Sequence, residues 1–141
     1  MKTLLTFCAT MLMTLATVFG QANRTLVKSL DGHGAQTIVS QFPGEVKVRE
    51  TETHFIRITA NIKLDNFTDE ILHRLVEAGR YNIQSEMSAD GKLVLSMPNL
   101  QKKVIIKGTN LVEHLSFELE VPKGMTLEKA ILTLTDANQS M

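Results

Sequence analysis

The sequence has almost no cysteine and few aromatic side chains. Its one cysteine, Cys8, lies in an apolar run near the N-terminus, so a chain that loses this run holds no thiol. Without disulfides, the remaining domain must be stabilised by its hydrophobic core alone. The chain has no tryptophan and a single tyrosine, Tyr81. It therefore lacks the aromatic platforms on which carbohydrate and base-stacking sites usually depend.

The chain also has no excess of positive charge. It carries 15 Lys and Arg residues against 15 Asp and Glu residues. Removing Lys2 with the N-terminal run leaves 14 basic against 15 acidic residues, a net charge of −1. No basic stripe of the kind needed to bind a phosphate backbone is present. We expect no nucleic-acid partner.

The first 20 residues have the pattern of a cleavable signal peptide. Lys2 is followed by an uncharged apolar run, and the small residues Val18 and Gly20 stand at the third-last and last positions before a cut. We interpret residues 1–20 as the signal peptide and residues 21–141 as one exported β-rich domain, periplasmic, secreted or on the cell surface. After cleavage we expect no membrane contact. An uncleaved anchor is the alternative, because about 20 residues can span a bilayer.

Two further features bear on the compartment. An exported domain without disulfides favours a bacterial envelope protein. Three Asn-x-Ser/Thr triplets, at Asn23, Asn66 and Asn138, point weakly to a eukaryotic secreted protein. No small-residue lipobox precedes Cys8, which argues against a lipoprotein.

Apolar and polar residues alternate with the period of two that is typical of half-buried strands. The clearest case runs from Ile56 to Leu64, where a slip of one residue would expose the whole apolar face. Asp90-Gly91 between two strand-like runs predicts a hairpin. The strands we expect are residues 26–30, 37–40, 45–50, 55–64, 81–87, 92–97, 104–106, 115–121 and 127–134.

One segment has helical spacing instead. The apolar residues between positions 71 and 76 recur as on one face of an amphipathic helix. Thr68 can cap its start, Phe67 can pack on Leu72 as a hydrophobic staple, and Gly79 supplies a left-handed stop. We predict a helix over residues 69–78. The predicted fold is mainly β with one inserted α-helix, in a short antiparallel or solenoid-like stacked β-sheet domain.

No residue pattern predicts a metal or cofactor site. The four histidines are His33, His54, His73 and His114, and no two have the i, i+4 spacing of helical metal ligands. His73 lies on the polar side of the predicted helix, where we expect it to be solvated. We assign no metal-binding and no cofactor-binding residue.

Catalytic patterns are equally absent. The turn Asp31-Gly32-His33-Gly34 combines an acid with a histidine, but its residue types are those of a tight turn. No Gly-x-Ser-x-Gly nucleophile elbow occurs. The positions of Glu50, Glu52 and Glu77 in the sequence do not predict a pair of carboxylates at the separation typical of glycosidases. We assign no catalytic residue and expect a protein that is not an enzyme.

Three lysines, Lys102, Lys103 and Lys107, surround the apolar run Val104-Ile105-Ile106. Lysines at a strand edge discourage pairing between sheets of different molecules, and we interpret the cluster in that way.

The order of elements supports a family resemblance. Residues 44–48 form a Gly-x-Val-x-Val motif. It is followed by a strand (residues 55–64), a helical insertion (residues 68–79), a Gly-x-Leu-x-Leu strand (residues 91–95) and a strand closing in Val-Pro-x-Gly (residues 121–124). This order resembles the adhesin family of bacterial envelope proteins related to the head-GIN adhesin domain.

The resemblance implies a stacked β-architecture on the cell envelope, without known catalysis and with an adhesive or scaffolding role. This chain ends one strand after the Val-Pro-x-Gly motif, so the resemblance predicts a truncated member. A stack that ends early leaves an unpaired strand edge. We expect that edge to be residues 127–134 or residues 37–40, pairing with a second copy or with an envelope protein.

The sequence thus predicts a non-enzymatic, secreted or envelope-associated structural or protein-interaction module. Two alternatives remain. A periplasmic ligand-binding or regulatory domain would show an apolar cleft beside the helix, and a hydrolase would bring His33, His54 and His114 together with an acid.

Overall fold

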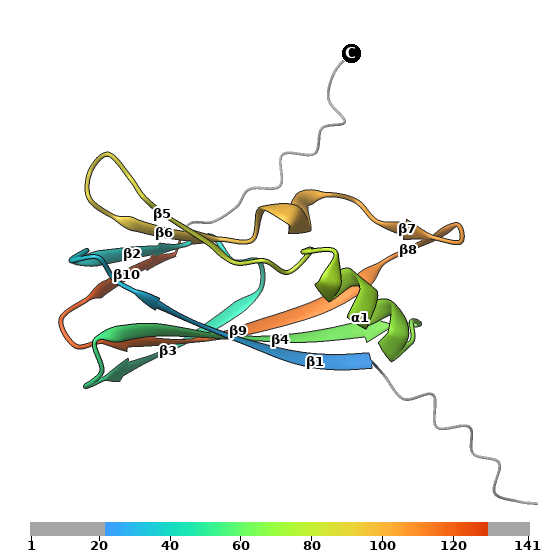
Figure 1. Ribbon diagram of the computed structural model, residues 1–141, viewed down its shortest axis with the longest axis horizontal. Helices are drawn as coiled ribbons and strands as arrows, with labels where there is room; N and C mark the ends of the chain where they lie inside the picture. The colour runs from blue at the N-terminus through green and yellow to red at the C-terminus, as the bar shows by residue number, and fades with distance from the viewer. Residues whose placement is uncertain (1–21, 130–141) are drawn as a thin grey trace, which may run out of the picture.

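The computed structural model describes residues 22–129 (Figure 1). The predicted signal peptide and the end of the last predicted strand lie outside this range. The described chain forms β1 (Ala22–Asp31), β2 (Thr37–Ser40), β3 (Glu45–Thr51), β4 (Phe55–Asp65), α1 (Asp69–Glu77), β5 (Gln84–Met87), β6 (Leu93–Ser96), the 3-10 helix η1 (Pro98–Gln101), β7 (Ile105–Ile106), β8 (Thr109–Asn110), β9 (Val112–Pro122) and β10 (Thr126–Lys129).

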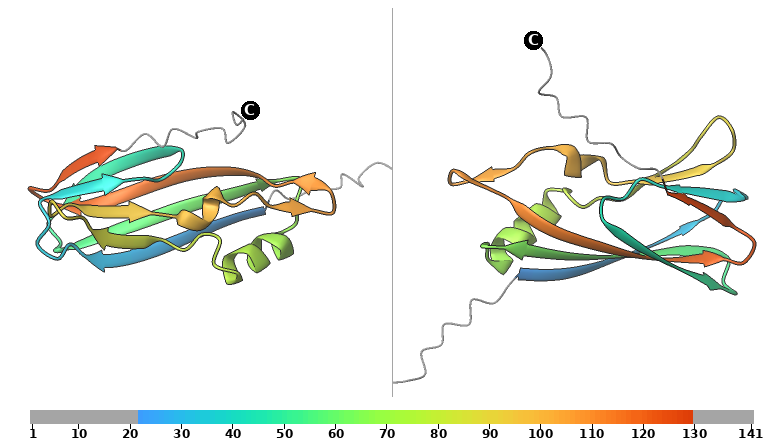
Figure 2. Two further views of the ribbon diagram at one scale, coloured as in Figure 1. Left: turned by 90° about the horizontal axis from the view of Figure 1, so that it is seen from above. Right: turned by 180° about the vertical axis from the view of Figure 1, so that it is seen from behind.

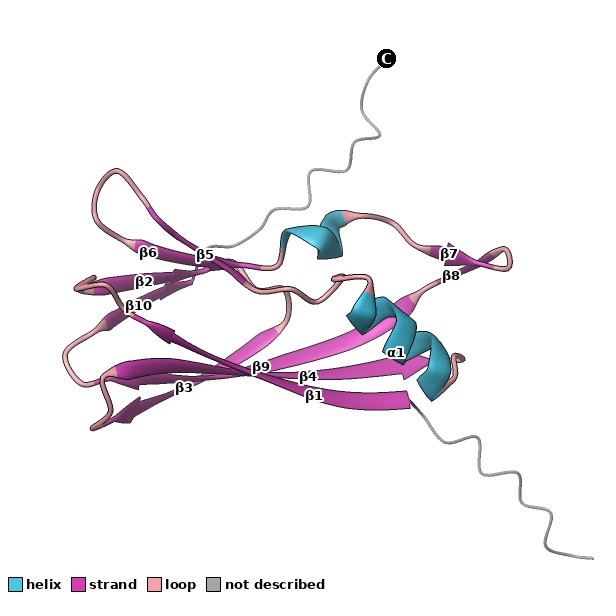
Figure 3. Ribbon diagram, in the orientation of Figure 1, coloured by secondary structure: helices cyan, strands magenta, loops and turns pink. Residues whose placement is uncertain are grey.

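Two four-stranded sheets lie one above the other (Figures 1 and 2). Sheet A has the strand order β1-β4-β9-β3, and sheet B has the order β10-β2-β6-β5. Each sheet mixes parallel and antiparallel pairs, because β3 runs parallel to β9 and β2 runs parallel to both β10 and β6. Figure 3 shows how far strands outweigh helix. The predicted mainly β fold with one inserted α-helix is confirmed.

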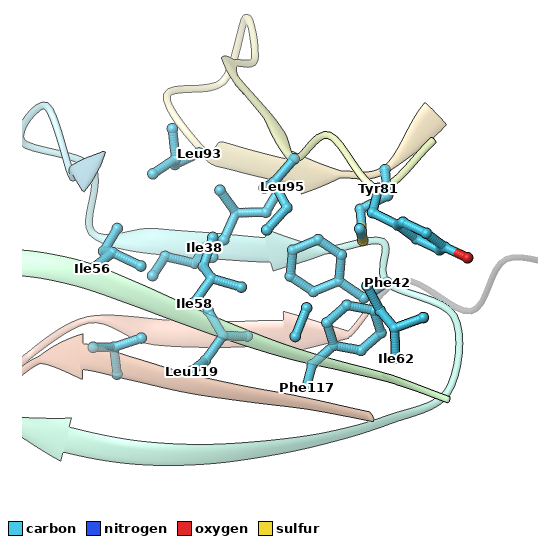
Figure 4. Close-up of a cluster of buried hydrophobic side chains, with 14 of the residues drawn as sticks. Ile38, Phe42, Ile56, Ile58, Ile62, Tyr81, Leu93, Leu95, Phe117 and Leu119 are labelled. Carbon is cyan, nitrogen blue, oxygen red and sulfur yellow. The ribbon is translucent and has the colours of Figure 1, made fainter. Parts of the chain in front are cut away.

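The core lies between the two sheets, on the face that the sequence predicted for β4. Every second residue of β4 from Ile56 to Leu64 is buried. Figure 4 shows Ile58 and Phe117 of sheet A facing Ile38 and Leu95 of sheet B. The rings of Phe42 and Phe117 stack with their centroids 4.6 Å apart. The register of β4 is therefore set by burial, as the alternation requires.

The helix forms where the sequence predicts it. Its first turn is capped by Thr68, whose side-chain oxygen accepts a hydrogen bond from the Ile71 N–H at 3.4 Å. The helix ends at Glu77, one residue before the predicted end, and Gly79 follows with φ +81°. Leu72 is fully buried and attaches the helix to the core. The predicted cap and stop are confirmed.

The first strand is longer than the sequence indicated. β1 pairs with β4 residue by residue from Ala22 opposite Leu64 to Asp31 opposite Phe55. The strand 26–30 predicted from local residue types is thus extended at its polar start by pairing with a long neighbour. The opposite holds for β5, which begins at Gln84 because residues 81–83 form a turn and an extended linker.

A second hairpin was only half predicted. Ile105 and Ile106 pair with Asn110 and Thr109, and the turn between them is Lys107-Gly108. Both turn residues have positive φ, +49° and +78°. This is the type I′ geometry that matches the twist of a two-residue hairpin.

Strand order corrects one prediction about the sheet edge. β2, the strand Thr37–Ser40, lies between β10 and β6 and is not an edge. It is interior because it receives a parallel partner on each side, which short local patterns do not reveal. Within residues 22–129, β10 does stand at the edge of sheet B.

Candidate functional site

Four strands stand at sheet edges in the described part of the chain: β1 and β3 in sheet A, and β10 and β5 in sheet B. The edge of β1 is partly occupied, because the Lys28 ammonium donates to the Ile83 carbonyl at 2.6 Å and residues 81–84 line a hollow beside it. In the part of the chain that the structure describes, β5 and β10 each have four residues. Within residues 22–129, β3, with seven residues, is the longest edge without such an overlying segment.

The apolar side of β3 is only partly covered. Its parallel register with β9 puts Val48 beside Leu119, on the side of sheet A that faces the core. Leu119 is fully buried, whereas Val48 is 45% exposed. Within residues 22–129, sheet B therefore does not reach over the margin of sheet A at β3. The sequence predicted a half-buried strand here, but β3 is mostly exposed because it lies at an edge.

Charged side chains surround this margin. Glu50 follows Val48 on the same side of the strand and interrupts the apolar row. On the opposite side, Arg49 forms an ion pair with Glu120, and Lys47 is exposed. Charges on an edge strand limit indiscriminate pairing with other sheets. They leave the main-chain groups free for a partner strand of complementary pattern.

The outer face of sheet A is polar and holds a hollow of about 390 Å³. Thr25 and Asn61 are part of its lining, and the Thr25 hydroxyl donates to the Asn61 side-chain oxygen at 2.8 Å. No aromatic side chain takes part in the lining, which is Asn23, Arg24, Thr25, Asn61, Ile62, Lys63, His114, Leu115 and Ser116. Charged, polar and apolar side chains together line this hollow, so it differs from the apolar cleft expected beside the helix in a ligand-binding domain.

His33, His54 and His114 do not all come together at one place. His114 contacts the Asp65 carboxylate at 2.6 Å, and His73, half exposed on α1, lies 3.2 Å from Glu77. His54 directly precedes β4, while His114 lies opposite Lys63 near the far end of that strand. The two are thus separated by roughly 30 Å of extended chain. Within residues 22–129, no three metal-ligating side chains form a cluster.

The acidic residues considered in the sequence are also dispersed. Glu52 contacts Lys123 near the β3–β4 turn, Glu77 contacts His73, and Glu50 lies on the β3 edge. The turn at Asp31 is a local structure, in which the His33 N–H donates to the Asp31 carboxylate at 3.0 Å. The turn prediction for this segment is confirmed.

A buried polar cluster was not found from the sequence. Arg80 and Glu113 form a two-point ion pair, with Nε 3.0 Å from Oε2 and Nη2 2.6 Å from Oε1. The Tyr81 hydroxyl donates to Oε2 at 2.5 Å. Arg80 Nη1 also donates to the carbonyls of Asn99 and Lys102, at 3.2 and 2.9 Å. These contacts join the end of α1 to η1 and β9.

The cluster shifts two pKa values. The Glu113 carboxylate raises the pKa of Arg80 above its usual value. Burial, followed by the hydrogen bond to Glu113, raises the pKa of the Tyr81 hydroxyl well above its usual value. With Arg80 donating to three partners and Glu113 accepting on both oxygens, the cluster is satisfied internally. It functions as a structural clamp.

Among residues 22–129, no helix has the length and apolar character needed to cross a bilayer.

Comparisons with known proteins give one structural neighbour. No family model matches the sequence, and no curated protein matches it. The described neighbour is a crystal structure of a candidate cell adhesion protein from Clostridium sporogenes, with a TM-score of 0.40 and 12% identity. The match covers 76% of this chain and 45% of the neighbour, so this chain spans less than half the length of that protein. A TM-score below 0.5 does not establish a shared fold, and the predicted adhesin family stays a prediction.

Proposed function

We propose that this chain is a non-enzymatic, exported interaction module of adhesin-like kind that binds a polypeptide strand along β3. The observation that carries the proposal is the open seven-residue edge of β3 with Val48 45% exposed beside it. The partner is a second copy of the chain or an envelope protein that contributes an extended segment. Main-chain hydrogen bonds supply affinity in this mode, and side-chain pockets supply specificity.

The side chains of β3 fit a selective partner. A strand added beside β3 would cover Val48, which sheet B leaves exposed, and would meet Lys47 and Glu50 on opposite sides. Burial of the Val48 side chain would contribute about 1.5 kcal/mol to the free energy of binding. Opposite charges across the strands contribute further, and like charges oppose pairing. The partner strand should therefore carry an apolar residue opposite Val48 and charges complementary to its neighbours.

The test compares two valines on different edges. Val48→Asp changes the β3 edge, and Val27→Asp changes a valine that is 54% exposed on the outer face of β1. Residues 21–141 of each variant are measured by analytical ultracentrifugation, alone and with a solubilised bacterial envelope extract. We expect self-association or a defined complex that Val48→Asp abolishes and Val27→Asp preserves. A monomer that captures nothing, or a complex that survives Val48→Asp, would refute strand addition at β3.

A second candidate is binding of a small polar ligand in the hollow on sheet A. The observation that favours it is the convergence of Asn61, Lys63, His114 and Ser116 on one face. Thermal-shift screening of polar small molecules, with Ser116→Tyr to fill the hollow, tests it. A stabilising compound whose effect Ser116→Tyr removes would favour this candidate over the first.

A further inference from the structure

The β7–β8 hairpin projects from one end of the molecule (Figures 1 and 2). It is made of two residues on each side of the Lys107-Gly108 turn, and a further hydrogen bond from the Leu111 N–H to the Val104 carbonyl extends its ladder. Leu111 packs against the core and is the root of the hairpin. The tip is thus a short convex projection on a fixed base.

One side of this hairpin carries two solvent-exposed apolar side chains beside Lys103 and Asn110. Ile105 is 58% exposed, the second-largest exposure among the large exposed hydrophobic side chains of residues 22–129. If the register continues by one pair beyond Val104 and Leu111, Val112, 45% exposed, lies opposite Lys103, and Ile105 and Val112 share one face. Ile106 is half-buried on the other face. Together these two β-branched side chains give the hairpin a small exposed apolar surface.

The charge around this patch has one sign. Residues 102–112 contain three lysines and no acid. Lys102, Lys103 and Lys107 are exposed, and none forms an ion pair with another residue of the described chain. The nearest acids along β9 and β4 are already engaged, since Glu113 pairs with Arg80 and Asp65 with His114. The tip is therefore apolar and cationic together.

The base of the hairpin is rigid. Arg80 holds the Lys102 carbonyl at 2.9 Å on the incoming side and the Glu113 carboxylate on the outgoing side. Both ends of the hairpin are thus fixed by one buried guanidinium. A fixed tip loses little conformational entropy when it docks, which favours binding by few residues.

We propose that this hairpin inserts its tip into the surface of an anionic phospholipid bilayer. Ile105 and Val112 would enter the boundary between headgroups and acyl chains, while the three lysines contact anionic headgroups. Charge complementarity selects the anionic surface. The small convex tip selects a lipid surface over an acidic protein, because a stable protein interface needs about 800 Å² per partner. This inference departs from the sequence-based expectation of no membrane contact, and it uses none of the β3 residues.

The test exploits the absence of tryptophan in the chain. Ile105→Trp puts a single fluorescent probe at the tip, and Val27→Trp puts one at a similarly exposed position on sheet A. Full-length variants are mixed with vesicles of phosphatidylethanolamine and phosphatidylglycerol, or of phosphatidylcholine alone. Because both variants carry the same N-terminal apolar run, a difference in their tryptophan fluorescence shows that the hairpin tip itself contacts the lipid. We expect a blue shift and quenching by brominated lipid for Ile105→Trp on the anionic vesicles only.

The lysines are tested on the Ile105→Trp background. The double substitution Lys103→Glu and Lys107→Glu should raise the lipid concentration needed for half of the fluorescence shift by roughly thirtyfold or more. Arg57→Glu with Lys123→Glu, the same charge change at two exposed positions outside the hairpin and outside β3, should leave it nearly unchanged. Added salt should weaken the wild-type response. The proposal is overturned if Ile105→Trp shows no shift, shifts equally on phosphatidylcholine, or shifts with polyglutamate but not with vesicles, the last of which would assign the tip to an acidic protein.

Discussion

The Arg80 guanidinium and the Glu113 carboxylate meet in a buried two-point ion pair that connects the turn after α1 with the start of β9. Arg80 is 9% exposed. The two residues lie 33 positions apart in the chain. The pair therefore closes a long segment that contains β5, β6, η1 and the β7–β8 hairpin, and removing one partner would leave a charge inside the protein.

We predict that Glu113→Gln lowers the free energy of unfolding by about 3 kcal/mol, because Arg80 then keeps a buried charge without its counter-ion. Urea denaturation measures the loss. The matched control is Glu70→Gln, which removes an exposed ion pair with Arg74 on α1 and should cost at most about 0.5 kcal/mol. Equal losses for the two variants would show that the buried pair is not a clamp.

Tyr81 gives a second, spectroscopic prediction. Its folded-state pKa is raised, chiefly by burial, above the usual value near 10. A raised folded pKa means that the native protein keeps a proton that the unfolded chain loses. The stabilising contribution is therefore complete below about pH 10 and declines as the pH rises above it.

Because Tyr81 is the sole tyrosine and there is no tryptophan, phenolate absorbance reports this one group. We expect it to titrate near pH 10 in urea and clearly higher in the native protein. Tyr81→Phe should flatten the alkaline fall in stability that the wild type shows. If the phenolate titration has the same midpoint pH in the native and in the unfolded protein, the Tyr81 hydroxyl is not buried as described.

Local patterns predicted the parts of the fold whose causes are local. The apolar face of β4 and the helix between Thr68 and Gly79 depend on neighbours in the sequence, and both were predicted nearly to the residue. The Ser88–Gly91 loop also forms the predicted hairpin, with the Ser88 N–H donating to the Lys92 carbonyl at 2.8 Å.

Features that depend on distant strands were missed. Nothing near Thr37–Ser40 shows that two parallel partners enclose it, so the sequence leaves it as one of two alternative edge strands. Nothing near Arg80 shows that Glu113 will meet it. Gly108 was the one local signal that could have revealed the β7–β8 hairpin, because it stands between two short apolar runs. The exposed tip depends on the pairing of the two hairpin strands, which brings Lys103 and Val112 to one face.

Gly44 and Gly91 allow the cost of an unfavourable backbone conformation to be distinguished from the cost of a steric clash. Gly44 and Gly91 both have positive φ, +96° and +79°. A Cβ at Gly44 would lie 2.6 Å from the Leu115 carbonyl oxygen, whereas a Cβ at Gly91 meets nothing within 4 Å among the described atoms. We predict that Gly91→Ala costs about 1 kcal/mol, from backbone conformation alone. Gly44→Ala should cost about 3 kcal/mol, since β3 must also move away from β9. Equal losses in urea denaturation would show that β3 shifts freely.

The last prediction is that the charge of Glu50 prevents the β3 edges of two molecules from pairing with each other. Glu50 follows Val46 and Val48 on the core-facing side of β3 and sits beside Val121 of β9. Glu50→Val would complete an apolar row on an open strand, and such edges pair with one another. We expect concentration-dependent self-association by sedimentation velocity, with the stability of the monomer nearly unchanged.

The control is Thr59→Val, which adds an apolar residue on the outer face of the interior strand β4. This variant should associate no more than the wild type does, because the main-chain groups of β4 are already paired on both sides. Association by Thr59→Val to the same extent would attribute the effect to surface hydrophobicity and not to the free edge.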